Sequence, residues 1–130
     1  RSSDLLFAAQ QKLDHLIAFV DLNRQQLDGY TDEILALGDL RRKFEDFGWH
    51  AVEVDGHDVS AIHDAIEDAK SRAGVPSMIV LDTVKGKGWS VTEGRTGIHH
   101  IPITPEQAAA AKKELGAQIS ALQAKLQEVC

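Results

Sequence analysis

The sequence has 130 residues, enough for one domain, and its composition of 43% hydrophobic and 26% charged residues is ordinary for a globular protein. The formal net charge of −6 argues against nucleic acid or an anionic membrane as the main partner. No apolar run reaches the ~18 residues of a membrane span, and the first residues do not resemble a signal peptide.

The cysteine content bears on the cellular compartment. Cys130 is the only cysteine, so an intrachain disulfide is excluded, which suits a reducing cytoplasm. We therefore expect a cytoplasmic protein. The sequence lacks an initial methionine and begins inside a predicted helix, which fits either a processed chain or a fragment.

The first forty residues predict a helix, a strand and a long polar loop. Residues 4–13 have apolar side chains at helical spacing, whereas the continuous apolar run 16–20 is too short for a helix and is typical of a strand in a parallel sheet. The polar stretch 21–38 follows, with a turn expected at Asp28–Gly29 and one helical turn near residues 33–35.

The helix and strand signals then alternate. A helix is predicted over residues 39–47 and a strand over 51–54, followed by a helix that begins after an N-cap at Asp58 and ends before Gly74. The third strand is predicted over 78–81, and residues 84–103 form a second polar loop with several glycines. Thr104 and Gln107 form a capping box at the start of the last helix, whose apolar stripe is Leu115, Ile119, Leu122, Leu126 and Val129.

This order of elements predicts an α/β fold with a parallel sheet and helices on both faces. We expect residues 1–104 to form an incomplete α/β domain and residues 105–130 an amphipathic helix that packs on that domain or on a partner. Right-handed crossovers place the two polar loops at the carboxyl ends of strands, where open parallel sheets bind ligands. Three strands are few, since sheets usually have about 4–6, so the chain is expected to pair with further structure.

Three polar segments in these loops are candidate sites. Asn23 directly follows a buried strand, and its amide oxygen suits a hard cation such as Mg²⁺ or Ca²⁺, with a turn carbonyl such as that of Gln25 as a second ligand. The alternative is that Asn23 only stabilises a turn. Lys85 stands in a glycine-flanked basic segment that suits a phosphate or, alternatively, a solvated turn. The His99–His100 pair offers a hydrogen bond to a phosphate or substrate oxygen, or has no role.

The ordered set of these segments resembles transketolase. The matching runs are DLNRQQLDG at residues 21–29, KFEDFGW at 43–49, VDGHD at 54–58 and TVKGKG at 83–88, so the resemblance spans roughly residues 5–104. It is most similar to the separately encoded N-terminal subunits of split transketolases. The resemblance implies the thiamine-diphosphate-binding fold, with thiamine diphosphate and Mg²⁺ or Ca²⁺ as cofactors.

The resemblance also implies roles for individual residues. Asn23 matches a side-chain ligand of the metal, and Gln25 matches a main-chain carbonyl ligand. Leu27 matches an apolar residue near the thiamine rings, and Lys85 a lysine that reaches the diphosphate. His100 matches a loop histidine near the cofactor and the substrate channel, here assigned as catalytic, although Ile101 stands where the family has glycine.

The implied activity is transfer of a two-carbon ketol unit between sugar phosphates. The family's Gly-Asp-Gly segment and its pyrimidine-binding domain have no counterpart in these 130 residues. The expected partners are therefore the remainder of the enzyme, in a homo- or hetero-oligomer, and the chain alone is expected to be inactive. A deoxyxylulose-phosphate synthase and a non-catalytic α/β assembly module are the alternatives.

Overall fold

The computed structural model describes residues 2–27 and 29–129, and the chain forms two compact units that divide after Thr83. Asp28 of the predicted turn and the lone Cys130 lie outside the described residues, as does the side chain of Val129 in the predicted apolar stripe.

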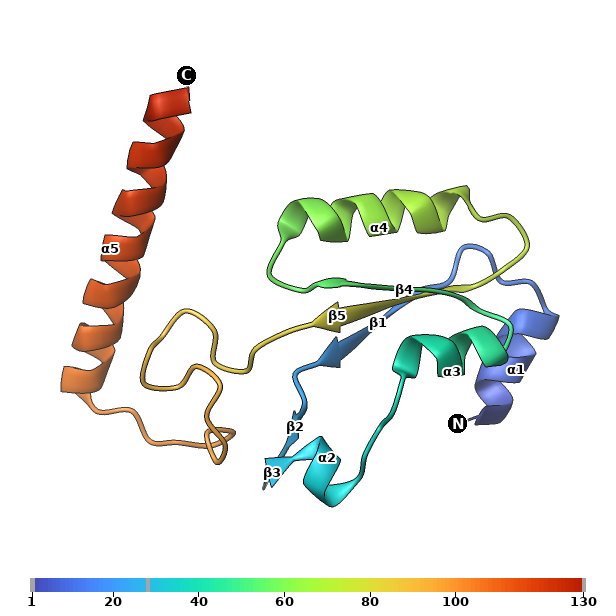
Figure 1. The fold of residues 1–130 in the computed structure, drawn as a ribbon, viewed down its shortest axis with the longest axis horizontal. Coiled ribbons are helices and arrows are strands. Elements are labelled where there is room, and N and C mark those ends of the chain that lie inside the picture. Colours follow the sequence, from blue (N-terminus) through green and yellow to red (C-terminus); the bar gives the residue numbers. More distant parts are fainter. Residues whose placement is uncertain (1, 28, 130) are drawn as a thin grey trace. The chain divides into compact units, whose positions relative to one another are not determined.

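The first unit contains a sheet of three parallel strands, β1 (Ile17–Leu22), β4 (His50–Asp55) and β5 (Ser77–Asp82). Their order is β1-β5-β4, so β5 lies in the centre, and its Ile79 and Val80 are fully buried (Figure 1). A central strand of a parallel sheet is covered on both faces, which explains its continuous apolar run. The predicted parallel α/β sheet is confirmed.

Helices cover both faces of this sheet, as predicted. Figure 1 shows α4 (Val59–Ser71) on one face and both α1 (Ser2–Gln10) and α3 (Leu40–Asp46) on the other. On the latter face, Ala8 and Trp49 form a buried cluster with alternate strand residues, namely Ala51, Met78 and Val80. The Trp49 indole also donates a hydrogen bond to the Leu5 carbonyl at 3.0 Å, which satisfies its buried N–H group.

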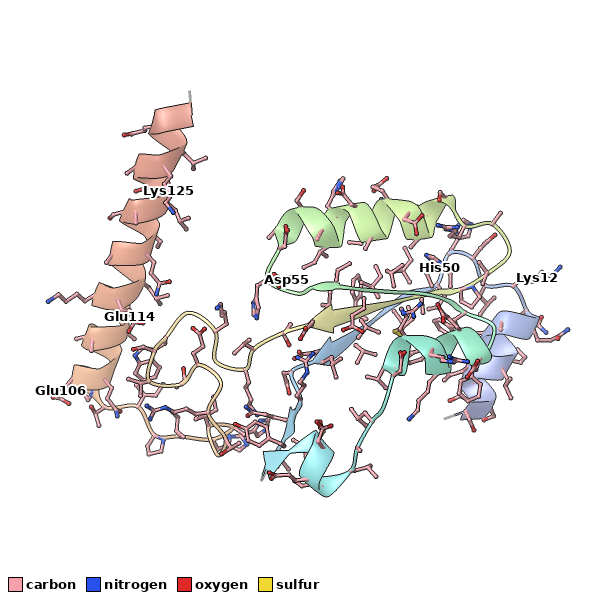
Figure 2. The ribbon with its side chains drawn as sticks, viewed as in Figure 1. Lys12, His50, Asp55, Glu106, Glu114 and Lys125 are labelled. Carbon is pink, nitrogen blue, oxygen red and sulfur yellow. The ribbon has the colours of Figure 1, made fainter. Side chains whose placement is uncertain are left out.

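A polar network joins the start of β4 to α4. His50 lies at the start of β4 and Asp55 at its end (Figure 2). His50 Nε2 lies 2.7 Å from Asp68 Oδ2, and Arg72 donates to Asp68 Oδ1 at 2.6 Å. We call His50, Asp68 and Arg72 the β4–α4 network.

Local sequence signals predicted the helix starts well. Asp58 accepts hydrogen bonds from the backbone N–H groups of Ser60 and Ala61 at 2.9 and 3.1 Å, as the predicted N-cap requires. The helix predicted over 39–47, by contrast, is shorter in the structure, because Asp39 is the N-cap of α3 and accepts from Arg42 N at 2.9 Å, and Phe47 is its C-cap.

The polar stretch 21–38 holds more structure than predicted. It contains a two-residue antiparallel pair, β2 (Gln25–Gln26) and β3 (Gly29–Tyr30), followed by α2 (Thr31–Ile34). The strands β1, β4 and β5 also extend past their apolar runs to Leu22, Asp55 and Asp82. Ladder hydrogen bonds continue regardless of side-chain polarity, so apolar runs underestimate strand length at a solvated edge.

The second unit consists of an irregular loop and α5 (Pro105–Val129). The predicted capping box is present, because Gln107 N donates to Thr104 Oγ1 at 3.3 Å and Thr104 N donates to Gln107 Oε1 at 2.9 Å. Ser90 holds the loop to α5 through Glu114, which accepts from its N–H and hydroxyl groups at 2.9 and 2.8 Å.

Within the described part of the chain, no helix has the length and apolar character needed to cross a membrane. The α5 residues Leu122 and Leu126 are 61% and 67% exposed. The expectation that this stripe packs on a domain or a partner stays a prediction.

Candidate functional site

The carboxyl ends of the strands bring together residues from distant parts of the sequence. Leu22 of β1 and Asp55 of β4 both pair with Asp82 of β5, so the three strands end level with one another. The segments that follow β1 and β5 therefore begin at the same edge. Ligands of open parallel sheets bind at this edge, which makes it the candidate site.

Asn23 directly follows β1 at this edge, and both ends of its side-chain amide form hydrogen bonds. Its Oδ1 accepts a hydrogen bond from the backbone N–H of Gln25 at 2.9 Å, and its Nδ2 donates to Asp21 Oδ2 at 3.3 Å. The expected turn-stabilising contact is thus present. It does not exclude a metal role, because an amide oxygen has two lone pairs and the turn uses one.

Arg24, the next residue, has a left-handed backbone with φ of 58°. For a residue with a Cβ this conformation costs roughly 1–2 kcal/mol. The carbonyl of Arg24 accepts from Thr31 N at 2.9 Å, and its guanidinium forms a two-point ion pair with Asp82, in which the Nη2–Oδ2 distance is 3.1 Å. These contacts help to hold the strained residue in place.

The same ion pair changes the titration of Asp82. The hydrogen bond from the Arg24 guanidinium, reinforced by its charge, lowers the pKa of the Asp82 carboxyl below its ordinary value. The side chains of Arg24 and Asp82 are 51% and 42% exposed, so water weakens their attraction.

Asp21 and Thr83 make a second connection between β1 and the end of β5. The Thr83 hydroxyl donates to Asp21 Oδ1, and Asp21 Oδ2 accepts from Asn23, so both carboxylate oxygens are engaged. Asp21, Asn23, Arg24, Asp82 and Thr83 are hereafter the strand-end cluster.

Gly56 packs closely behind this cluster. A Cβ atom at this position would lie 2.4 Å from Thr83 Cγ2 and 3.2 Å from the Asp82 carbonyl oxygen. Its N–H group donates to that same carbonyl at 2.8 Å. Only glycine fits here without displacing Thr83, so the turn after β4 helps to fix the cluster.

The other predicted cofactor residues of the first unit lie just beyond Asn23. Gln25 begins β2 and pairs with Tyr30 of β3, which fixes the backbone of the loop. Leu27 follows and is 60% exposed. Asn23 thus contacts the backbone N–H group of Gln25, the assignment of both residues to a metal stays a prediction, and Leu27 presents an apolar side chain to solvent.

Lys85 and the two histidines belong to the second unit, where a pocket of about 350 Å³ is lined by Lys85, Gly86, Trp89, Thr92, Ile98, His99, Ile101 and Ile103. Lys85 Nζ lies 3.4 Å from His99 Nδ1. The pocket thus combines a lysine and a histidine ring with apolar walls.

His100, the predicted catalytic histidine, does not line this pocket. Its ring meets that of His99 edge to face, with centroids 4.6 Å apart. The structure therefore places His99 beside Lys85, and His100 beside His99.

Sequence reasoning missed the roles of Asp21, Arg24, Asp82 and Thr83. Their signal was position, since each stands within a few residues of the end of a predicted strand. Among the residues that the structure describes, no group of three or more His, Cys, Asp or Glu side chains is arranged to hold a metal ion.

Comparisons with known proteins agree with this geometry. The family model described as transketolase, thiamine diphosphate binding domain, matches residues 2–128. The chain is 49% identical to a 6-deoxy-6-sulfo-D-fructose transketolase subunit of Clostridium sp., over 85% of this chain and 40% of the relative. It is 34% identical to an apulose-4-phosphate transketolase subunit of Phocaeicola vulgatus, over 88% of this chain and 41% of the relative.

Solved structures show the same similarity. A transketolase from Campylobacter jejuni matches 88% of this chain and 18% of its own chain, with a TM-score of 0.79 and 28% identity. A transketolase from Pichia stipitis in complex with fructose 6-phosphate matches 98% of this chain and 22% of its own, with a TM-score of 0.65 and 26% identity. The chain thus spans about 40% of the curated subunits and about a fifth of these structures.

Proposed function

Because the chain belongs to the transketolase family, within its thiamine-diphosphate-binding domain, we propose that the complete protein transfers a two-carbon ketol unit between sugar phosphates. Thiamine diphosphate, when bound, supplies the nucleophilic carbon on which ketol transfer depends. The role of this chain is to hold the metal and diphosphate end of that cofactor.

The observation that carries the proposal is the geometry of Asn23. Its amide is oriented by Asp21 and by the Gln25 N–H group, at the strand edge where ligands of such sheets bind. One lone pair of the amide oxygen remains for a divalent cation, Mg²⁺ or Ca²⁺, and the Gln25 carbonyl is the proposed second ligand. Oxygen donors are the ligands that these hard cations prefer, so the residues fit the group.

Two oxygen atoms do not complete a Mg²⁺ shell, which takes about six ligands. The proposed partner is the remainder of the enzyme, which carries the missing metal ligand and the pyrimidine-binding domain or subunit in a homo- or hetero-oligomer. The relatives named as subunits support this assembly, and the matched region is only about 40% of their length.

The remaining proposed roles concern one residue of the first unit and two residues of the second. In the first unit, Leu27 would pack near the thiamine rings. In the second, Lys85 would approach the diphosphate and His100 the substrate channel. The half-buried Lys85, placed in a pocket with apolar walls, supports an anionic ligand there.

The substrate class is a ketose that carries an anionic group. One relative is named for 6-deoxy-6-sulfo-D-fructose and another for apulose 4-phosphate. A panel of phosphorylated and sulfonated ketoses would therefore be assayed with the complete enzyme, together with pyruvate as a donor. Acceptance of pyruvate in place of every ketose would support a synthase and overturn the transketolase assignment.

The cofactor site is tested with Asn23→Ala in the complete enzyme. Loss of a metal ligand should weaken thiamine diphosphate binding in the presence of Mg²⁺ by about 10-fold or more, measured by isothermal titration calorimetry. Binding equal to that of the native enzyme would remove Asn23 from the site. No binding by the native enzyme would favour an assembly module without catalysis.

A further inference from the structure

We infer that Asp21 is a positioning residue that selects the orientation of the Asn23 amide and so presents its oxygen atom to a divalent cation. The inference rests on the proposed function, because it concerns the same cation. Asp21 would act through Asn23, by holding the amide nitrogen from behind, rather than by contacting the cation.

The first step of the argument is the near symmetry of the amide. The oxygen and nitrogen ends of an Asn side chain have almost the same shape, but only the oxygen can bind a cation. A rotation of the amide by half a turn would put N–H donors where the cation is proposed to bind. Something in the fold must therefore select one orientation.

Two groups make this selection, and they select the same orientation. The Asp21 carboxylate can only accept, and its Oδ2 lies 3.3 Å from Asn23 Nδ2. The backbone N–H of Gln25 can only donate, and it lies 2.9 Å from Asn23 Oδ1. Rotating the amide would break both contacts and would bring like groups together at each end.

Asp21 is itself held from the neighbouring strand. Thr83, directly after β5, donates its hydroxyl to the second carboxylate oxygen of Asp21. The ladder continues to this point, because Thr83 N donates to Leu22 O at 3.3 Å. The Thr83 methyl group also packs against Gly56, where a Cβ atom would lie only 2.4 Å from it.

The Arg24–Asp82 ion pair supports the same loop from its other side. It holds the left-handed residue that follows Asn23, and with it the turn that brings the Gln25 N–H group to the Asn23 oxygen. The strand-end cluster thus has two side-chain connections between the ends of β1 and β5, one through Asp21 and one through Arg24. Only the Asp21 connection contacts the amide.

Thr83 separates this role from two alternatives. If Asp21 were itself a metal ligand, removing the Thr83 hydroxyl would free one of its oxygens and would not weaken binding. If Asp21 only stabilised the fold, removing the hydroxyl would lower the unfolding temperature without a specific loss of cation affinity. Positioning predicts weaker cation binding by a protein that remains folded.

The experiment is a Mn²⁺ titration of the complete enzyme with thiamine diphosphate, followed by electron paramagnetic resonance, beside thermal unfolding of each variant. Thr83→Val keeps the shape of the side chain and the net charge but removes the donor. It should raise the Mn²⁺ dissociation constant about 10-fold, which is the lower end of the loss in metal affinity typical for removal of a residue that orients a metal ligand. Thr83→Ser retains the hydroxyl and should restore most of that loss.

Two further variants complete the test. Asp21→Ala removes the acceptor that faces Asn23 Nδ2 and should also weaken Mn²⁺ binding, whereas Asp68→Asn in the β4–α4 network should leave it unchanged. If Asn23→Ala weakens binding but Thr83→Val and Asp21→Ala both bind like the native enzyme, the positioning role is wrong. If Asn23→Ala itself has no effect, the metal site of the proposed function is wrong.

Discussion

Two polar networks of the first unit are built alike but stand in different surroundings. In the strand-end cluster, Asp21 is contacted by Thr83 and Asn23. In the β4–α4 network, Asp68 is contacted by His50 and Arg72. Each carboxylate therefore joins a strand to a neighbouring segment through two partners.

The difference lies in what each network holds. The β4–α4 network connects a regular strand to a regular helix, both of which have backbone hydrogen bonds of their own. The strand-end cluster holds an irregular loop with a left-handed Arg24, next to a glycine that no other residue can replace without a shift. A similar set of contacts thus adds stability in one place and fixes a loop conformation in the other.

The largest effect is expected from Gly56→Ala. The added methyl group would lie 2.4 Å from Thr83 Cγ2, so overpacking should lower the free energy of unfolding by about 1–3 kcal/mol. Because Thr83 must move, Mn²⁺ binding by the complete enzyme should weaken too. Chemical denaturation and the Mn²⁺ titration would measure the two effects.

Gly116→Ala is the matched control for this substitution. Gly116 lies inside α5, and a Cβ atom there would meet nothing within 4 Å. Replacing a glycine inside a helix by alanine should stabilise the protein, by roughly 0.5–1 kcal/mol. Equal effects of the two substitutions would show that Thr83 is not held by Gly56.

An intermediate effect is expected from Asp68→Asn. The hydrogen bond from Arg72, and then that from His50, lowers the pKa of the Asp68 carboxyl in the folded state. A lowered carboxyl pKa contributes stability that is complete above the unfolded-state pKa and is lost as pH falls through the folded-state pKa. The native protein should therefore unfold at a higher temperature than the variant near neutral pH, and the difference should shrink in acid.

Thermal unfolding across a pH series from neutral to strongly acidic would measure this difference. A constant gap between the two proteins across the series would contradict the role given to the Asp68 charge. A change in Mn²⁺ affinity in Asp68→Asn would contradict the distinction between the two networks.

The smallest effect on stability is expected from Asp82→Asn. The variant loses the charge that pairs with Arg24, but both side chains are about half exposed, so the loss should stay below about 1 kcal/mol. The ion pair should affect the conformation of the loop after β1 more than the free energy of unfolding. We expect proteolysis between residues 23 and 30 to become faster in this variant while the unfolding temperature changes little, and unchanged proteolysis would count against the pair as a support of the loop.

Much of the fold was open to prediction because its signals are local. Asp58 and Thr104 precede helices and accept hydrogen bonds from N–H groups two or three residues ahead, an arrangement that depends on neighbouring residues alone. The apolar runs likewise identified the strands β1 and β5, but the expectation that the strand before Asn23 is buried was wrong, because β1 lies at the edge of the sheet and only β5 is buried. The pair β2 and β3 escaped prediction, because two-residue strands have no periodicity to detect.

The candidate site, like the fold, was predictable from the sequence only in part. Sequence motifs identified the segments around Asn23 and Lys85, but they did not indicate which side chains meet. The contact of Asp21 with Thr83 spans 62 positions, that of Arg24 with Asp82 spans 58, and that of Lys85 with His99 spans 14.

By itself, then, the sequence determined the main elements, their alternation and the segments that are candidates for the site, because these depend on residues close together along the chain. Tertiary structure alone decided that Leu22 lies opposite Asp82, and therefore that Asp21 meets Thr83 beside Asn23. The physical reason is strand register: moving β1 by one residue against β5 would turn its side chains to the opposite face, and this is set by packing of the whole sheet.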